Sequence, residues 1–183
     1  LTKWLGEELI LHWTKIYKIK ANSLRLFNVY GPRSRSNSNY GAVFGVFLAQ
    51  KLSNKPFTIV GNGKQTRDFT YISDVVAALY KACKSNISRE IFNVGSEKEV
   101  SVNQIVKLLR GKKTNIPKRP GEPDRSLADI KKIKKMLNWY PKISINQGVK
   151  ILLNNINYWK KAPLWNSHSI KKATRDWFKY LKS

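Results

Sequence analysis

Residues 61–74 read GNGKQTRDFTYISD and combine a turn, a short strand and the start of a helix. The glycines at 61 and 63 are turn residues, and the β-formers between 69 and 72 predict a strand. Asp74 is expected to cap a helix that runs to about Lys84. A strand that leads directly into a helix is a building unit of α/β folds.

Arg67 and Asp68 directly precede this expected strand. A guanidinium is a planar fork that matches phosphate oxygens two at a time, so Arg67 predicts an anion site. Asp68 is expected to hold that guanidinium or to cap a backbone turn. A second basic loop, KRPGE at 118–122, places Glu122 three residues after Arg119, where an acid can accept two hydroxyls of a ribose. Taken alone, each loop is also explained by surface salt bridges.

The composition is that of a chain with a packed core. The 183 residues suffice for one domain or for part of a larger protein, and 42% of them are apolar. No apolar run approaches the roughly 20 residues that cross a bilayer, and no secretory signal is visible. A single cysteine, Cys83, fits a reducing cytosol, so we expect a cytoplasmic protein. With only His12 and His168 beside it, a Cys/His metal site is not expected.

The charge is strongly basic, with 35 Lys and Arg against 11 Asp and Glu, a formal net charge of +24. Such an excess attracts polyanions. The lysines are nevertheless scattered, as in the run at 131–135, whereas a nucleic-acid surface more often clusters arginines with exposed aromatics. A lysine-rich solvated surface is therefore the favoured interpretation. An acidic partner or a missing acidic half would also explain the charge, and a basic module that binds nucleic acid remains the alternative from another class.

Strands alternate with helices along the chain, which predicts an α/β fold. Capping-box patterns at Ser101/Gln104 and Ser144/Gln147 predict two helix starts. Leu5, Leu9, His12 and Ile16 recur at helical spacing on one apolar stripe, so this face and His12 are expected at the core or its boundary. Cys83 is expected to be a small buried side chain, and the polar stretch 33–39 is typical of a surface loop. The other expected helices cover residues 3–18, 43–52 and 168–181, and the other expected strands cover 23–27, 57–60 and 91–94.

Four blocks in this order resemble a known family. They are RLFNVYGPR at 25–33, PFTIVGNGKQTRDFTYISDVV at 56–76, IFNVGS at 91–96 and KRPGEPDRSLADIKKIKKMLNW at 118–139. Together they resemble the extended short-chain dehydrogenases/reductases, and more narrowly the NAD-dependent nucleotide-sugar epimerases, dehydratases and decarboxylases. The resemblance covers residues 1–160, and 161–183 form a helical tail of unknown role.

The resemblance implies the C-terminal part of a Rossmann-type parallel sheet. A smaller α/β substrate-binding lobe is expected from roughly 28–72 and 96–140. In this family a Tyr-x-x-x-Lys pair lies at the start of a long helix, and LTKWLGEEL at 1–9 is similar to the sequence that follows that tyrosine. Lys3 is then the lysine of the motif. The tyrosine and the Gly-rich NAD loop are expected in an N-terminal half that is missing here, and the fragment alone is expected to be inactive.

The resemblance also implies roles for single residues. A bound NAD takes a hydride from the sugar, commonly at C4, and Lys3 binds the nicotinamide ribose and lowers the pKa of the tyrosine. Phe27 maps onto the nicotinamide contact and Asn28 onto the substrate phosphate contact. The remaining substrate-binding positions are the backbones of Thr58 and Val60 for the base, Arg67 and Arg119 for the diphosphate, and Glu122 for the ribose hydroxyls.

Among the reactions of the family, we expect a UDP-sugar 4-epimerase that is a homodimer when full length. A nucleotide-sugar 4,6-dehydratase and a uronate decarboxylase are the alternatives. Residues 41–45, GAVFG, lack an arginine that would clamp a C6 carboxylate, which disfavours the decarboxylase. A third possibility is a fragment that binds sugar nucleotides without catalysis.

Overall fold

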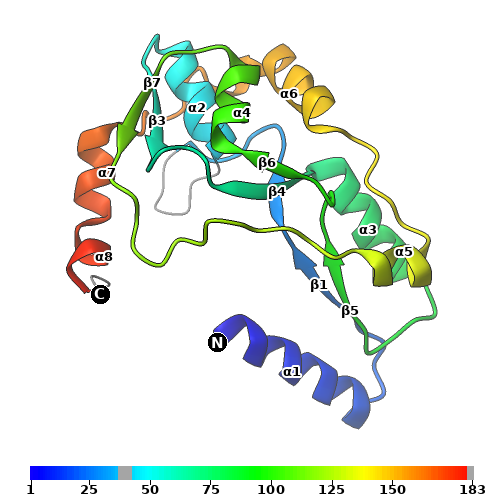
Figure 1. Ribbon diagram of the computed structural model, residues 1–183. Coiled ribbons are helices and arrows are strands. Elements are labelled where there is room, and N and C mark those ends of the chain that lie inside the picture. The colour runs from blue at the N-terminus through cyan, green and yellow to red at the C-terminus, as the bar shows by residue number, and fades with distance from the viewer. Residues whose placement is uncertain (37–42, 181–183) are drawn as a thin grey trace. The chain divides into compact units, whose positions relative to one another are not determined.

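The computed structural model describes residues 1–36 and 43–180 (Figure 1). Within them the chain divides into two compact units. Unit 1 comprises residues 1–29, 68–98 and 127–143, and unit 2 comprises residues 30–67, 99–126 and 144–183. The polar stretch 33–39 and the GAVFG segment at 41–45 lie partly outside the described residues. No helix in the described part of the chain is long and apolar enough to cross a membrane.

Unit 1 contains a parallel pair of strands, with Ser23 opposite Ile91 and Leu26 opposite Val94. One core forms where α3 (Ile72–Lys84) and α5 (Lys131–Leu137) pack on these strands, and Phe92, Ala78 and Ile133 are fully buried in it. The elements of unit 1 are α1 (Thr2–Ile16), β1 (Ser23–Leu26), α3 (Ile72–Lys84), β5 (Ile91–Val94) and α5 (Lys131–Leu137). The strands β2 (Asn28–Tyr30) and β4 (Thr66–Tyr71) each span a point where the chain passes between units.

Asp74 does not cap α3, contrary to the expectation from its sequence position. The helix begins two residues earlier, at Ile72, and its N-cap Tyr71 makes no side-chain cap. Asp74 is buried instead, and its Oδ2 accepts hydrogen bonds from the backbone N–H groups of Lys142 and Ile143 at 3.0 and 2.9 Å. Its carbonyl accepts a further bond from the buried Trp139 indole. Asp74 therefore ties the 139–143 segment to α3.

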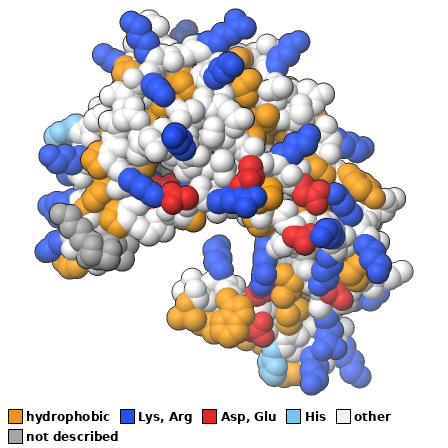
Figure 2. Space-filling view, in the orientation of Figure 1, with side chains coloured by type: hydrophobic (Ala, Val, Ile, Leu, Met, Phe, Trp, Pro, Cys, Tyr) orange, Lys and Arg blue, Asp and Glu red, His pale blue; other side chains and the backbone are white. Residues whose placement is uncertain are grey.

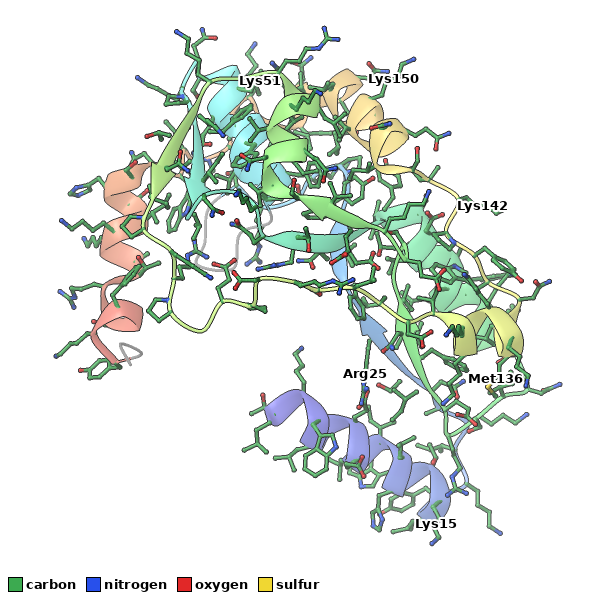
Figure 3. All side chains as sticks on the ribbon, viewed as in Figure 1. Lys15, Arg25, Lys51, Met136, Lys142 and Lys150 are labelled. Carbon is green, nitrogen blue, oxygen red and sulfur yellow. The ribbon has the colours of Figure 1, made fainter. Side chains whose placement is uncertain are left out.

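The helix α1 is fixed to β1 through one buried carboxylate. Glu7 accepts hydrogen bonds from Ser23 Oγ at 2.7 Å and from Arg25 Nη2 at 2.6 Å. Figure 3 shows Arg25 extending from β1 toward α1. The apolar stripe of α1, which the sequence predicted as a core face, is instead exposed, and His12 is exposed with it.

Unit 2 is built on a second parallel pair, with Phe57 opposite Lys113 and Val60 opposite Ile116. The Phe47 ring of α2 (Val43–Leu52) stacks on Phe57 with ring centroids 4.8 Å apart. Both predicted capping boxes are confirmed, at the starts of α4 and α6. The elements of unit 2 are α2 (Val43–Leu52), β3 (Phe57–Val60), β6 (Glu99–Ser101), α4 (Val102–Leu109), β7 (Lys113–Ile116), α6 (Ile145–Asn154), η1 (Ile156–Trp159), α7 (Ser167–Ala173) and α8 (Arg175–Tyr180).

Three further expectations differ from the structure. Cys83 is exposed rather than buried, because it lies on the outer face of α3. Residues 127–140, expected in the substrate lobe, pack into the core of unit 1 through Ile130 and Trp139. The helix expected over 168–181 is two shorter helices, α7 and α8, and both belong to unit 2.

Candidate functional site

A pocket of about 530 Å³ lies within unit 2. One side is formed by the turn between β3 and β4, including Val60 and Gln65, and the other by the 118–124 loop. The turn is held from the start of α4, because Asn103 N donates to Gly63 O at 3.0 Å. Gly63 has φ +74°, and a Cβ there would meet the Asn103 side chain at 2.7 Å, so the turn requires glycine.

The 118–124 loop is fixed against the first residue of β4. Thr66 N donates to Asp124 O at 2.9 Å, and Ser126 N donates to Thr66 O at 3.2 Å. A salt bridge of 2.5 Å between Lys118 and Asp124 closes the loop on itself. Gly121 has φ +71°, a left-handed conformation that favours glycine.

This arrangement brings two predicted site residues together. Arg67 Nη2 lies 3.1 Å from Glu122 Oε1, although 55 positions separate them in the chain. Arg67 Nη1 also donates to Thr66 O at 2.8 Å, so the guanidinium is held in one orientation. The side chains of Arg67 and Glu122 are only 12% and 25% exposed. Glu122 Oε2 is buried and has no hydrogen-bond partner among the described residues, which leaves an acceptor ready for a ligand hydroxyl.

Arg119 lies in the same loop, half-buried and three residues before Glu122. Lys118 beside it lines the pocket. The 118–124 loop therefore carries two cations and two carboxylates, of which Lys118 and Asp124 are paired with each other. That donor and acceptor set is suited to a ligand that has both phosphate and hydroxyl groups.

The backbones of Thr58 and Val60 face the edge of β3 opposite to β7. Phe57 N donates to Lys112 O at 2.8 Å, so residues 57, 59 and 61 pair with β7 in the parallel register. The N–H and C=O groups of the alternate residues, Thr58 and Val60, consequently point away from β7. An open strand edge offers alternating donors and acceptors to a ligand or to another segment.

Two glutamines already occupy part of this edge. Gln50 Oε1 accepts from Thr58 N at 3.1 Å, and Gln65 Nε2 donates to Val60 O at 2.8 Å. Sequence reasoning missed both residues. The available signal was Gln50 itself, a polar residue inside the apolar helix VFGVFLAQKL. It is 1% exposed and needs partners for its amide.

Asp68 does not hold the Arg67 guanidinium; it caps a backbone turn, the second of its two expected roles. Arg67 and Asp68 are consecutive within β4, and successive strand residues point to opposite faces. Asp68 is fully buried and accepts from Ser96 N at 2.6 Å, Glu97 N at 3.0 Å and Ala128 N at 3.2 Å. A Cβ at Gly95 would meet Asp68 Oδ2 at 2.7 Å, which explains the glycine of IFNVGS.

The remaining predicted residues lie in unit 1. Lys3 is exposed in the first turn of α1, one helical turn before Glu7. Phe27 is half-buried, and its N–H continues the β1–β5 pairing by donating to Val94 O at 3.0 Å. Asn28 begins β2 and is exposed. The roles of these three residues, like those of the residues in unit 2, stay predictions.

The chain resembles known proteins over most of its length. It superimposes on the UDP-glucose 4-epimerase of Thermotoga maritima, solved with UDP-glucose, with a TM-score of 0.79 and 32% identity, covering 87% of this chain and 52% of that one. For the UDP-glucuronic acid 4-epimerase of Bacillus cereus, solved with UDP-glucuronic acid and NAD, the TM-score is 0.77 and the identity 34%, covering 85% and 51%. UDP-glucuronic acid decarboxylase 1 of Xenopus tropicalis is 30% identical over 165 residues, 87% of this chain and 38% of that protein.

The chain thus spans about half the length of the two epimerases, and the likeness confirms the expected α/β fold with parallel strands. A model of the family described as "NAD dependent epimerase/dehydratase family" matches residues 1–95, which is more than half of the 183 residues. The chain therefore belongs to the NAD-dependent epimerase/dehydratase family.

Proposed function

We propose that the protein that carries this chain converts a nucleotide sugar with the help of NAD, and that unit 2 binds the nucleotide diphosphate. The observation that carries the proposal is the pairing of Arg67 with Glu122 at a pocket lined by Glu122 and Val60. The family resemblance assigns these three positions to the diphosphate, the ribose and the base. The fold brings them into one unit from segments far apart in the sequence.

The chemistry of each group supports this division. Arg67 and Arg119 offer charge-assisted hydrogen bonds to the diphosphate, each contributing about 1.5–3 kcal/mol. Glu122 Oε2 accepts from the ribose hydroxyls. At the edge of β3, Thr58 C=O and Val60 N–H form an acceptor–donor pair for the base. Uracil matches it with its N3–H donor and a flanking carbonyl. In unit 1, Asn28 is the proposed contact to the substrate phosphate.

Unit 1 would form part of the proposed NAD site, and its residues Lys3 and Phe27 suit that cofactor. Lys3 is an exposed ammonium with three donors, which suits the hydroxyls of the nicotinamide ribose. Its positive charge would also lower the pKa of a nearby tyrosine that acts as the base. Phe27 offers a half-buried apolar ring to the nicotinamide. When bound, NAD supplies an acceptor for the hydride that leaves the sugar carbon and a donor for the return of that hydride.

The proposed reaction is 4-epimerisation of a UDP-sugar, as in the two epimerases whose structures resemble this chain. UDP-glucuronate decarboxylation is the second candidate, because the Xenopus decarboxylase is also 30% identical. A 4,6-dehydratase is the third candidate. The products distinguish the three when the full-length protein is incubated with UDP-glucose and with UDP-glucuronic acid. An epimeric sugar supports the first candidate, carbon dioxide with a UDP-pentose the second, and a 4-keto-6-deoxy sugar the third.

The partners proposed for this chain are an N-terminal half with the tyrosine and the Gly-rich NAD loop, and a second copy of the full-length protein. Both would pack on apolar side chains that unit 1 exposes on α1 and α3. A cytoplasmic location is part of the same proposal.

The experiment that tests the proposal is a calorimetric titration of the 183-residue chain with UDP. We expect Arg67→Ala and Arg119→Ala each to weaken binding by about 10- to 150-fold, the loss of one charge-assisted hydrogen bond. Arg67→Lys should restore binding only in part, because a point charge cannot replace the bidentate fork.

Arg125→Ala is the matched control, because Arg125 is 69% exposed and its Nε pairs with Glu99 rather than facing the pocket. It should leave UDP binding unchanged. The proposal fails if the unaltered chain does not bind UDP. It also fails if the alanine variants at 67 and 119 bind UDP normally but melt earlier, since the arginines would then be structural ion pairs. Loss of DNA binding in these variants, with no effect of UDP, would support the nucleic-acid module instead.

A further inference from the structure

The C-terminal tail, residues 161–183, accepts hydrogen bonds from other segments of unit 2 through the backbone carbonyls of Pro163 and Trp165. Ser36 Oγ donates to Pro163 O at 2.8 Å, and Gln50 Nε2 donates to Trp165 O at 2.7 Å. Just before them, the Trp159 indole donates to Ser34 O at 2.8 Å. Ser36 and Gln50 are 3% and 1% exposed, so these contacts are inside the unit rather than on its surface.

Gln50 connects this tail with the edge of β3. Its Nε2 donates both to Trp165 O and to Thr58 Oγ1, the latter at 2.8 Å, while its Oε1 accepts from Thr58 N at 3.1 Å. Gln50 lies on α2 among buried apolar neighbours such as Phe47 and Leu48. A buried amide in such surroundings is stable only when its donors and acceptor are all engaged.

The tail helps to hold the Gln50 amide in place. Thr58 sets the orientation of this amide, because Oε1 accepts from Thr58 N and a turned amide would place its own donors against that N–H. The two hydrogens of Nε2 then go to Thr58 Oγ1 and to Trp165 O. Without the carbonyl of Trp165 one buried N–H of Gln50 would lose its acceptor, and the side chain would be held less firmly against Thr58.

The orientation of this amide bears on the proposed base contacts. Gln50 occupies Thr58 N–H, and Gln65 occupies Val60 C=O at the other end of the edge. The groups between them are Thr58 C=O and Val60 N–H. If Gln50 shifts away from β3, the Thr58 peptide loses its anchor and the spacing of this pair is no longer fixed.

We propose that Gln50 is a positioning residue that couples the C-terminal tail to the base-binding edge of β3, so that the tail is part of the nucleotide site. This inference rests on the proposed function of unit 2. It gives the tail, which lies beyond the blocks that resemble the family, a role in holding the nucleotide base. The diphosphate contacts of Arg67 and Arg119 do not depend on it.

Two substitutions separate the links that Gln50 makes. Gln50→Glu keeps an acceptor for Thr58 N and for the Thr58 hydroxyl, and its ionised carboxylate has no donor for Trp165 O. Measurements at a pH above the pKa of the introduced carboxyl therefore test the tail link. Gln50→Leu breaks both links. Gln147→Leu is the control, because Gln147 also bonds backbone in unit 2 but does so at the capping box of α6.

The readouts are calorimetric titrations with UDP and with pyrophosphate, and hydrogen exchange of the amides in 166–180 with and without UDP. We expect Gln50→Glu, which removes one hydrogen bond, to weaken UDP binding about 3-fold, and Gln50→Leu, which removes all three, to weaken it by about 10-fold or more. Pyrophosphate binding should change less than about 2-fold in both. UDP should slow exchange of the tail in the unaltered chain and in the Gln147→Leu chain but not in the Gln50→Glu chain, because coupling between two sites is reciprocal.

The outcomes distinguish this inference from the proposed function. If the unaltered chain binds UDP and both Gln50 variants bind it equally well, the inference is overturned and the proposed function stands. Equal losses for UDP and pyrophosphate would also overturn it, since Gln50 would then support the unit as a whole. If no UDP binding is found at all, the proposed function fails. The link through Gln50 is then tested by hydrogen exchange alone. If the amides of the tail and of β3 exchange at the same rates in Gln50→Glu as in the unaltered chain, the link is refuted.

Discussion

At the scale of the residue, the strand alternation of β4 explains why an arginine and an aspartate stand side by side. Arg67 faces Glu122, whereas Asp68 points inward and binds three backbone N–H groups. A buried carboxylate with this many donors holds the 96–97 turn and Ala128 in place. The Arg–Asp pair thus provides one residue for the proposed ligand site and one for the framework of unit 1.

Glu122 is the residue whose proposed role can be isolated most directly. Its Oε1 holds Arg67, and its Oε2 is buried without a hydrogen-bond partner among the described residues. We expect Glu122→Gln to weaken binding of UDP by about 10-fold or more, because a carboxylate accepts from two hydroxyls and an amide oxygen from fewer. Binding of 2′,3′-dideoxyuridine diphosphate, which has no ribose hydroxyls, should change by less than about 3-fold. Calorimetry with both nucleotides measures the difference.

Glu99→Gln serves as the control for this comparison, because Glu99 pairs with Arg125 and Thr66 and lies outside the pocket lining. It should affect both nucleotides equally and weakly. Equal losses for UDP and its dideoxy analogue in Glu122→Gln would show that Glu122 acts only by holding Arg67.

At the scale of the element, local patterns were predicted well and distant partners were not. The capping boxes at Ser101 and Ser144 need only residues three apart, and both are present. Asp74 also looked like a cap, but its partners at 142 and 143 lie 68 and 69 positions away and no local pattern reveals them. For the same reason Gln50 was missed, because its partners, Thr58 and Trp165, belong to other elements.

The loop patterns alone pointed to Arg67 and to the Arg119/Glu122 pair, and the family resemblance supplied the other proposed site residues. The meeting of Arg67 with Glu122 depends on the pairing of Thr66 with the 124–126 segment, which is a contact between distant parts of the chain. The apolar stripe of α1 shows a second limit of prediction from sequence, which concerns burial. Its helical periodicity was correctly seen, yet Leu5, Leu9 and Ile16 are 50%, 50% and 54% exposed. Periodicity identifies an apolar face but not what covers it.

The attachment of α1 to β1 makes a prediction about pH. The Arg25 guanidinium, followed by the Ser23 hydroxyl, lowers the pKa of Glu7 against the opposing effect of burial. A carboxyl whose pKa is lower in the folded state contributes stability above its unfolded pKa and loses it as the pH falls through the folded value. We expect Glu7→Gln to reduce the free energy of unfolding by about 1–2 kcal/mol at pH 7, a modest value because Arg25 is half exposed. The difference should shrink below about pH 4.5 and vanish once Glu7 is protonated in the folded chain.

Urea denaturation at several pH values measures this difference. Glu8→Gln is the matched control, because Glu8 neighbours Glu7 in α1 but is exposed. A loss of stability in Glu7→Gln that stays constant down to pH 3 would mean that packing of the side chain, and not its charge, anchors α1.

At the scale of the whole molecule, two surface properties oppose each other. The net charge of +24 repels other copies of the chain, and Figure 2 shows the Lys and Arg side chains spread over the visible face rather than gathered in one patch. The apolar residues exposed on α1 and α3 favour association. The stripe of α1 consists of Leu5, Leu9, Trp13 and Ile16, and that of α3 of Ile72, Val76, Leu79 and Tyr80. Stripes of this kind mark surfaces that another protein segment covers.

We therefore expect the isolated chain to associate with itself, and salt to strengthen the association. Raising the salt concentration from about 0.05 to 0.5 M shortens the Debye length severalfold and screens the repulsion between basic surfaces, while apolar burial persists. The variant Leu9→Gln/Trp13→Gln removes apolar surface from α1 without changing the charge, and it should shift the chain toward the monomer. Tyr140→Gln, at an exposed aromatic on another segment of unit 1, should not. Light scattering coupled to size-exclusion chromatography measures both effects. The sign of the salt dependence decides the cause: association that weakens as salt rises would arise from charges bridged by a polyanion, and the apolar stripe of α1 would then not be the contact.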